Sequence, residues 1–312
     1  MERRKLGESD LQISRLGCGT WAIGGGGWQY AWGAQDDGDS VGMLHAAWDR
    51  GINWIDTAPA YGTGHSEEVV GQAVRSWSGE RPLLFTKCGL TWNERRELGR
   101  DLSPARLRVE CEASLRRLRV DCIDLYQIHW PTEDPTEAEA AWGELARLRE
   151  AGKIRWAGVS NFEVPLLERL QRIMPVVSLQ PPYSLVRRGI EAEILPYCAL
   201  HNIGTLVYSP LESGLLTGAM TRERLMRMPW DDWRRTHPFF QEPAFSRHLE
   251  LVDRLRSAGA SRGLSPASLA VAWVLRQPAV TAAIIGARHP DQLEALLAAR
   301  LVPAAVWGDG PW

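Results

Sequence analysis

A chain of 312 residues, 45% of them hydrophobic, can bury a substantial core, either as two ordinary domains or as one large α/β barrel. Its net charge is −2 and its acidic and basic residues are interspersed, which argues against binding to nucleic acid or to an anionic membrane. Five cysteines, an odd number without CxxC spacing, predict neither a disulfide framework nor a zinc cluster. A small molecule is therefore the expected partner.

The sequence contains no sign of export or of membrane insertion. Its N-terminal segment is charged and lacks the apolar stretch of a signal peptide, and no run approaches the ~18 uninterrupted apolar residues of a membrane span. We therefore expect a protein of the reducing cytoplasm. Composition leaves the oligomeric state open.

The first residues predict a β-hairpin that turns at residues 7–10 and plugs the lower end of a barrel. Beyond it, short runs rich in β-branched or aliphatic residues alternate with longer amphipathic segments, which is typical of βαβ units and a parallel sheet. Eight such pairs can be counted. The predicted strands are residues 15–19, 53–56, 83–87, 123–129, 154–160, 176–180, 205–208 and 282–285.

The segments between these strands have the pattern of helices on the outside of a barrel. In one of them, four apolar side chains recur at spacings of three and four and share one helix face: Leu107, Cys111, Leu115 and Leu118. Ser103 and Ser265 each precede a proline, as expected of N-cap residues with proline in the first helical turn.

Eight strand–helix pairs in roughly 250 to 300 residues match a (β/α)8 TIM barrel, with a doubly wound sheet as the alternative. We predict one barrel domain, residues 1–312. Residues 20–39 and 209–246 form connections too long for simple turns, so we expect them to be lids or binding loops over the C-terminal face. Reactive groups in such barrels lie on the loops after the strands.

Residues 17–22, GCGTWA, match a dinucleotide-binding fingerprint, and acidic residues follow about twenty residues later. That fingerprint must open a helix. Four successive glycines at residues 24–27 follow instead, and each costs about 1 kcal/mol relative to alanine inside a helix. We therefore reject a Rossmann interpretation of this segment.

Four polar side chains stand at or just after the ends of neighbouring predicted strands. Asp56 ends the second strand, Tyr61 follows it, Lys87 ends the third and His129 ends the fourth. Taken singly, these residues are ordinary caps, surface charges or packed turn residues. Because adjacent strand ends of a barrel open onto one rim, all four side chains can converge there, and their conjunction indicates a functional site.

These residue types suit proton transfer to a carbonyl group. A phenol has an unperturbed pKa of about 10, which a neighbouring lysine ammonium lowers by favouring the phenolate. A carboxylate beyond the lysine keeps the ammonium charged and oriented. A histidine can then hydrogen-bond a carbonyl oxygen held between it and the phenol.

The motifs around these residues, DTAPAY at 56–61, TK at 86–87 and IHWP at 128–131, resemble the active-site elements of the aldo-keto reductase superfamily. The similarity runs from about residue 5 to residue 300. It includes three further motifs in the same order: GVSNF at 158–162, VYSPLESGLLTG at 207–218 and GARHPDQ at 286–292. The chain is most similar to short-tailed bacterial and fungal oxidoreductases and to the β-subunits of potassium channels.

The resemblance implies an NADPH-dependent reductase of aldehydes or ketones, keto-sugars included. It implies that Tyr61 is the general acid that protonates the carbonyl oxygen as hydride arrives, and that Lys87 lowers the pKa of Tyr61. It further implies that Asp56 holds Lys87 and that His129 orients the carbonyl.

The resemblance also implies a set of cofactor contacts. Ser160, Asn161 and Gln180 would hydrogen-bond the nicotinamide carboxamide, and Tyr208 would stack on the nicotinamide ring. The other implied cofactor contacts are Gly19, Thr20, Trp21, Ser209, Pro210, Leu211, Ser213, Gly214, Leu216, Ile285, Gly286 and Ala287.

Arg288 adds a charge argument to this set. It precedes Pro290, the expected first turn of the last helix, so a guanidinium and free helix N–H groups would meet one anion. This favours the 2′-phosphate of NADPH, and Gln292 would help to hold the adenosine end. Ala295 and Leu296 stand where many relatives have polar adenine contacts, so we expect fewer contacts to the adenine.

Six tryptophans lie in or beside the predicted rim loops: Trp28, Trp32, Trp92, Trp130, Trp230 and Trp233. Three of them, together with Trp21, are candidate substrate contacts, although core packing explains them equally well. The three are Trp28, Trp92 and Trp130.

Two other functions remain open from the sequence. One is a cofactor-loaded regulatory module with weak or no turnover, like the channel β-subunits. The other is a metal-dependent barrel hydrolase that uses Asp56 and His129, but the histidines show no HxH or HExxH spacing and no metal site is predicted.

Overall fold

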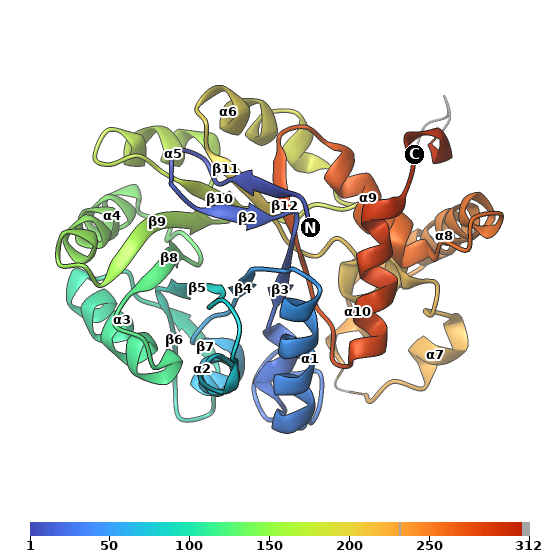
Figure 1. Ribbon diagram of the computed structural model, residues 1–312, viewed down its shortest axis with the longest axis horizontal. Helices are drawn as coiled ribbons and strands as arrows, with labels where there is room; N and C mark the ends of the chain where they lie inside the picture. The colour runs from blue at the N-terminus through green and yellow to red at the C-terminus, as the bar shows by residue number, and fades with distance from the viewer. Residues whose placement is uncertain (231, 308–312) are drawn as a thin grey trace.

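The computed structural model describes residues 1–230 and 232–307, so the last five residues of the predicted domain lie outside the described part. Eight parallel strands close into a barrel surrounded by helices, as predicted, and the doubly wound alternative is wrong (Figure 1). The strands are β3 (Leu16–Gly19), β4 (Trp54–Asp56), β5 (Leu83–Cys88), β8 (Ile123–Ile128), β9 (Ile154–Ser160), β10 (Ser178–Gln180), β11 (Gly204–Val207) and β12 (Val280–Ile285).

Each predicted strand overlaps an observed one, and the differences lie at the ends. β12 pairs in parallel with β3, with Ala283 opposite Leu16, and this pairing closes the barrel. His129 and Tyr208 follow their strands instead of ending them. Both residues therefore belong to the loops on the rim.

The predicted hairpin consists of β1 (Arg3–Lys5) and β2 (Gln12–Ser14). Leu6, Leu11 and Ile13 are buried against the side chains inside the barrel, where each contributes about 1.5–3 kcal/mol. A Cβ on Gly7 would come within 2.3 Å of the carbonyl oxygen of Val177, so the turn approaches the barrel as closely as its backbone allows. The hairpin therefore plugs one end, and ligands must enter from the other.

Helices form the outer layer (Figure 1). They are α1 (Asp37–Asp49), α2 (His65–Ser76), α3 (Pro104–Leu118), α4 (Pro135–Glu150), α5 (Val164–Gln171), α6 (Ile194–Leu200), α7 (Arg222–Met226), α8 (Ala244–Ala260), α9 (Pro266–Arg276) and α10 (Pro290–Leu297). The apolar face predicted for α3 is the face that it buries. In the part of the chain that the structure describes, no helix combines the length and apolar content needed to span a bilayer.

The two predicted helix caps differ. The backbone N–H of Ser268 donates to the hydroxyl of Ser265 at 3.0 Å, which caps α9 as expected. The side chain of Ser103 makes no such bond at the start of α3. Its own backbone N–H donates to Asp101 Oδ1 at 2.9 Å, so Ser103 is the N-cap residue before Pro104, as predicted, but its hydroxyl does not cap the helix.

The two long connections contain short helices of their own. Residues 20–36 include the 3-10 turn η1 (Trp21–Gly24) before α1 begins. Residues 209–243 include η4 (Glu212–Thr217), α7, η5 (Trp233–Arg235) and η6 (Pro238–Phe240). The remaining short turns are η2 (Tyr61–Gly64), η3 (Gly189–Glu191), η7 (Ala298–Leu301) and η8 (Ala304–Val306).

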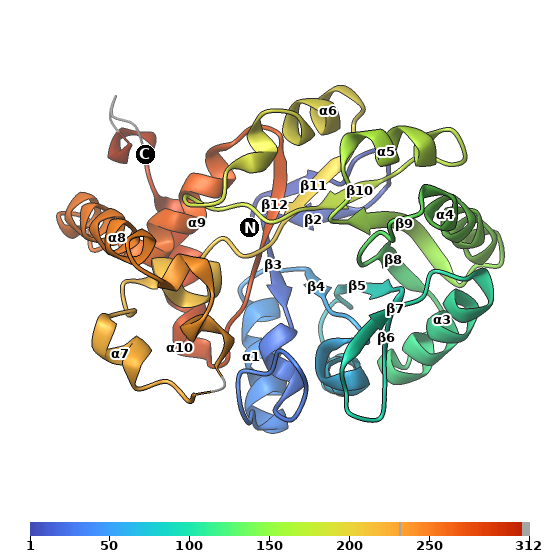
Figure 2. The same cartoon turned by 180° about the vertical axis from the view of Figure 1, so that it is seen from behind.

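One hairpin on the rim was not predicted. It consists of β6 (Leu90–Trp92) and β7 (Leu98–Arg100), which pair antiparallel after β5. This hairpin and the segment that carries α7 lie on opposite sides of the loop that follows β3 (Figure 2).

Candidate active site

The four side chains predicted at the strand ends lie together on the open rim. Lys87 donates from Nζ to Asp56 Oδ1 at 2.5 Å, to Tyr61 Oη at 3.2 Å and to the carbonyl oxygen of Thr57 at 3.0 Å. The His129 ring stands edge-on to the Tyr61 ring, with centroids 5.8 Å apart. None of the four residues is more than 6% exposed. The ammonium is thus fixed between a carboxylate and a phenol, out of contact with bulk water.

The backbone around Tyr61 explains how the phenol is placed. Tyr61 begins η2, in which Gly62 has the left-handed φ of 64°. A Cβ on Gly62 would lie 2.1 Å from the carbonyl oxygen of Gly24, so the turn after Tyr61 packs backbone to backbone against the loop after β3. Two glycines therefore set the position of the phenol relative to the neighbouring loop.

The second oxygen of Asp56 is held by two glutamines inside the barrel. Gln180 Nε2 donates to Asp56 Oδ2 at 2.7 Å, and Gln127 Nε2 approaches the same oxygen at 3.4 Å. Gln127 is fully buried and was missed by the sequence reasoning. Strand alternation could have found it, because a residue two before His129 in a strand points to the same side.

Burial controls the protonation of the site. It raises the pKa of Tyr61 well above its ordinary value, and the Asp56 carboxylate raises it further. Burial lowers the pKa of Lys87, while Asp56 opposes that shift. The prediction that Tyr61 has a lowered pKa is therefore wrong for this structure, because desolvation of the phenolate and the charge of Asp56 dominate. The raised pKa keeps the Tyr61 phenol protonated.

His129 is a neutral imidazole. Burial and the charge of Lys87 lower the pKa of its ring well below the ordinary value. Its Nδ1 is buried and has no hydrogen-bond partner among the described residues. A buried nitrogen without a partner costs about 1–3 kcal/mol, so the ring is suited to receive a ligand atom.

Aromatic side chains cover Tyr61 on the outside. Trp21 lies 5.2 Å and Trp28 lies 6.4 Å from its ring centroid, and both come from the loop after β3. Trp130 instead stacks under the guanidinium of Arg100 at 5.4 Å and is 37% exposed. Of the four predicted substrate contacts, Trp21 and Trp28 are thus in ring contact with Tyr61. For Trp92, on β6, and for Trp130 the described residues show no such contact.

The comparison with known proteins agrees with this geometry. The profile of the Aldo/keto reductase family matches residues 15–305, nearly the whole chain. The chain belongs to this family. The resemblance seen in the motifs is thereby confirmed.

Individual relatives of this family cover the chain almost completely. Aldo-keto reductase YhdN of Bacillus subtilis (strain 168) is 43% identical over 299 residues, which are 95% of this chain and 88% of the relative. The NADH-specific methylglyoxal reductase of Escherichia coli (strain K12) is 35% identical over 311 residues, 96% of this chain and 93% of the relative. The solved structure of glycerol dehydrogenase AKR11B4 from Gluconobacter oxydans is 44% identical, with a TM-score of 0.85, and covers 95% of this chain and 89% of its own.

Aldo/keto reductases use nicotinamide cofactors, and several residues implied for that cofactor form one hydrogen-bonded chain next to His129. Asn161 Nδ2 donates to the His129 carbonyl oxygen at 3.1 Å and to Ser160 Oγ at 3.0 Å, and Tyr208 Oη donates to Asn161 Oδ1 at 2.8 Å. Ser160 Oγ donates to the Gln180 carbonyl oxygen at 2.8 Å. The side chain of Gln180 is directed to Asp56, so its predicted role as a carboxamide ligand requires a change of partner.

The segment implied for the pyrophosphate has an unusual backbone. Four residues in it have left-handed φ values of 43° to 92°: Ser209, Glu212, Ser213 and Gly214. Left-handed residues in a turn direct successive N–H groups to one side and form concavities that bind anions. A Cβ on Gly214 would meet no atom within 4 Å, so the backbone there is open to a ligand.

Some implied cofactor residues are buried in the protein itself. Leu216 and Ala287 belong to the main core, and Ile285 is 2% exposed at the end of β12. Thr20 is fully buried and donates from Oγ1 to the Asp56 carbonyl oxygen at 3.2 Å. Gly19 and Gly286 border the rim: a Cβ on Gly286 would meet only the Gly19 carbonyl oxygen, at 3.9 Å.

Arg288 lies just before α10 and is half-buried. All partners of its guanidinium are neutral oxygens: Gln35 Oε1 at 2.5 Å, the Trp32 carbonyl at 3.4 Å and the Ala34 carbonyl. Within residues 1–230 and 232–307, no carboxylate forms an ion pair with it. Gln292 Oε1 accepts from the Arg288 backbone N–H at 2.8 Å. A cation without a charged partner at a helix start fits a phosphate.

Proposed function

We propose that the protein is an NADPH-dependent carbonyl reductase that acts on aldehydes or ketones, keto-sugars included. The observation that carries this proposal is the buried contact of Lys87 Nζ with both Asp56 Oδ1 and Tyr61 Oη, beside a neutral His129. Such an arrangement holds one acidic proton and one hydrogen-bond donor at a place where a carbonyl oxygen can meet both.

Each of the four side chains has a distinct part in the reaction. A bound nicotinamide supplies hydride to the carbonyl carbon. Tyr61, which its raised pKa keeps protonated, gives its proton to the carbonyl oxygen. The Lys87 ammonium then stabilises the phenolate that remains, and Asp56 keeps that ammonium in place. The neutral ring of His129 donates a hydrogen bond to the same oxygen and fixes its direction.

Support for NADPH rests on Arg288. Among the described residues its guanidinium has only neutral partners, and a phosphate offers the charged oxygens that a guanidinium binds in pairs. A relative that is 35% identical is an NADH-specific methylglyoxal reductase, so membership of this family does not by itself select NADPH. The proposed preference of this chain for NADPH therefore depends on the contacts that Arg288 makes.

The variant Tyr61→Phe tests the role of the phenol. It keeps the ring and its packing but removes the proton, so we expect kcat to fall by about 10²–10⁴. The dissociation constant of NADPH, measured by fluorescence titration, should change by less than about twofold, because Phe keeps the ring against Trp21 and Trp28.

The control for this variant is Tyr30→Phe, which makes the same change at a 39% exposed ring packed on the same tryptophans. It should retain turnover. Oxidation of NADPH would be followed with methylglyoxal, a simple aldehyde and a keto-sugar. Full activity of Tyr61→Phe would refute the role of Tyr61, and no oxidation of NADPH by any carbonyl in the unaltered protein would favour a binding module.

A further inference from the structure

Residues 32–35, called the strap here, form the last part of the loop between β3 and α1 and lie against Arg288. The strap occupies all three nitrogens of the guanidinium: Nε donates to Gln35 Oε1 at 2.5 Å, Nη1 to the Trp32 carbonyl at 3.4 Å and Nη2 to the Ala34 carbonyl. Gln35 Nε2 donates back to the Arg288 carbonyl oxygen at 3.3 Å. The two residues thus exchange hydrogen bonds across 253 positions of the chain.

The strap also reaches the segment proposed for the pyrophosphate. The guanidinium of Arg234 lies over the Trp32 ring at 5.4 Å, and its Nη1 approaches the Ser213 carbonyl oxygen at 3.4 Å. Asp232 neutralises Arg234 at 2.7 Å. The strap therefore bridges the two parts of the rim where anionic groups of a dinucleotide would lie.

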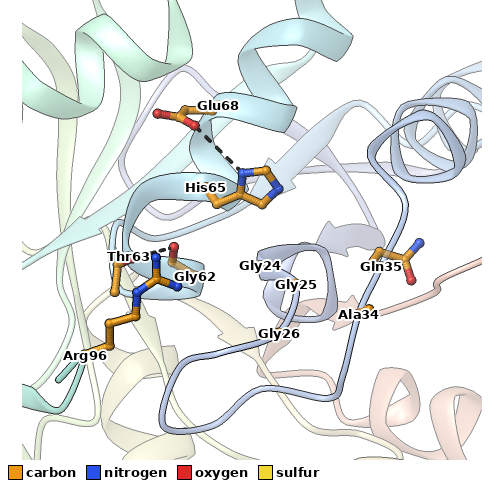
Figure 3. A pocket seen from close by; sticks show the side chains of 10 residues that line it. All are labelled: Gly24, Gly25, Gly26, Ala34, Gln35, Gly62, Thr63, His65, Glu68 and Arg96. Carbon is orange, nitrogen blue, oxygen red and sulfur yellow. Dashed lines mark hydrogen bonds and ion pairs between the residues drawn. The ribbon is translucent and has the colours of Figure 1, made fainter.

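Open space lies beside the strap. Ala34 and Gln35 line a cavity of about 460 Å³ whose other wall includes His65 and Glu68 at the start of α2 (Figure 3). Glycine residues 24–26 also line it. Ala34 and Gln35 therefore have open space beside them when they leave Arg288.

The strap takes three of the five N–H donors of Arg288, so a phosphate that binds the guanidinium through two parallel hydrogen bonds competes with it. The oxygens of the strap are uncharged, whereas hydrogen bonds from a guanidinium to phosphate are about twice as strong as neutral ones. A phosphate therefore wins this competition, but part of its binding free energy is spent on breaking the strap contacts. A dinucleotide without the 2′-phosphate leaves Arg288 on the strap and has no such cost.

We propose that Gln35 is a cofactor-specificity residue: by holding Arg288, it competes with the 2′-phosphate and narrows the preference for NADPH over NADH. Among the contacts of the strap with Arg288 it is the one made by a side chain, so it is also the one that substitution can remove. This inference rests on the proposed function, in which Arg288 binds NADPH.

The test is a set of dissociation constants for NADPH and NADH, measured by fluorescence titration of the full chain. Gln35→Ala should tighten NADPH by about three- to tenfold, the size of one net hydrogen bond, and leave NADH unchanged. Gln35→Glu should weaken NADPH more than NADH, because a carboxylate pairs with Arg288 and repels the phosphate. It also provides a second variant should Gln35→Ala fold poorly.

Two further variants complete the design. Gln29→Ala, on the same loop, removes a glutamine that bonds to Tyr30 and Leu98 and should leave both dissociation constants unchanged. In the background Arg288→Ala, which alone should weaken NADPH, adding Gln35→Ala should have no effect, since the two residues act through one contact.

The outcomes separate the inference from the proposed function. If Gln35→Ala leaves NADPH affinity unchanged while Arg288→Ala weakens it, the strap is no competitor and the inference is overturned, with the role of Arg288 intact. If Arg288→Ala weakens NADPH no more than NADH, the phosphate role of Arg288 fails and this inference fails with it. Tighter NADPH binding in Gln35→Ala alone supports both.

Discussion

The two halves of the barrel rim hold their charged side chains in different ways. On the half formed by β4, β5 and β8, Lys87 is fully buried and bonded to Asp56 and Tyr61, all on consecutive rim elements. On the half formed by β11 and β12, Arg288 is half-buried and bonded to a strap from the other end of the chain. The first half is fixed by contacts within the protein, whereas under the inference above the second exchanges partners when a phosphate binds.

This difference matches the role proposed for each half. A proton donor must be held within a few tenths of an ångström, and buried mutual hydrogen bonds provide that rigidity. A cofactor must enter and leave, so the groups that hold it need partners that can be displaced. The following substitutions test whether the two halves differ in this way.

The largest contrast should come from removing the cation of each half. In Lys87→Met, the buried carboxylate of Asp56 loses its charged partner, so we expect a loss of about 3–5 kcal/mol in the free energy of unfolding, with turnover abolished. In Arg288→Met, only hydrogen bonds to neutral oxygens are lost, and the expected cost is about 1 kcal/mol. Urea unfolding followed by tryptophan fluorescence measures both, and equal costs would contradict the comparison.

A smaller contrast concerns acid stability. The folded-state pKa of His129 lies well below its ordinary value, so below about pH 6.5 the unfolded chain binds a proton that the folded chain does not. The free energy of unfolding should therefore decrease as pH falls through that range, by up to about 1.4 kcal/mol per pH unit for one proton. At pH 7.5 the His129 ring is neutral in both the folded and the unfolded chain, so none of this stability is lost.

The variant His129→Asn should remove this part of the slope. His237, in the long segment on the cofactor half, also has a pKa lowered chiefly by burial, but the shift is less pronounced. His237→Asn should therefore flatten the slope less than His129→Asn does. Urea curves at several pH values between 5 and 7.5 give the slopes, and an unaltered slope in His129→Asn would show that its ring is not held neutral.

The same difference between the two halves explains which features of the fold and the site could be predicted from the sequence. The strands could be predicted because short apolar runs alternate with amphipathic segments. Barrel geometry then places Asp56, Lys87 and His129 on one rim, whatever their side chains contact. The sequence could not predict the direction in which the pKa of Tyr61 shifts, because that direction depends on how completely the phenol is desolvated. Gln127 was missed although it stands two residues before His129, where strand alternation places its side chain on the same face.

The cofactor half was harder to predict for a physical reason. The strap contacts Arg288 largely through backbone carbonyls, which leave no pattern in the residue types. Its one side-chain contact, Gln35, is 253 positions away from Arg288. The β6–β7 hairpin was missed for a related reason, since its second strand, Leu98–Arg100, has few apolar side chains to mark it.

The smallest expected effect concerns the helices outside the rim, where we expect the firmer contact on the cofactor half. Ser265 caps α9, which packs beside β12 on the cofactor half, whereas Ser103 makes no side-chain cap for α3 on the catalytic half. Ser265→Ala should therefore cost about 1 kcal/mol of unfolding free energy and Ser103→Ala only a few tenths. Equal losses of unfolding free energy in urea would mean that the hydrogen bond from Ser268 to Ser265 adds no stability beyond the general effect of replacing serine by alanine. The expected inequality would show that the helices of the cofactor half are as firmly built as the others, and that only its loops are exchangeable.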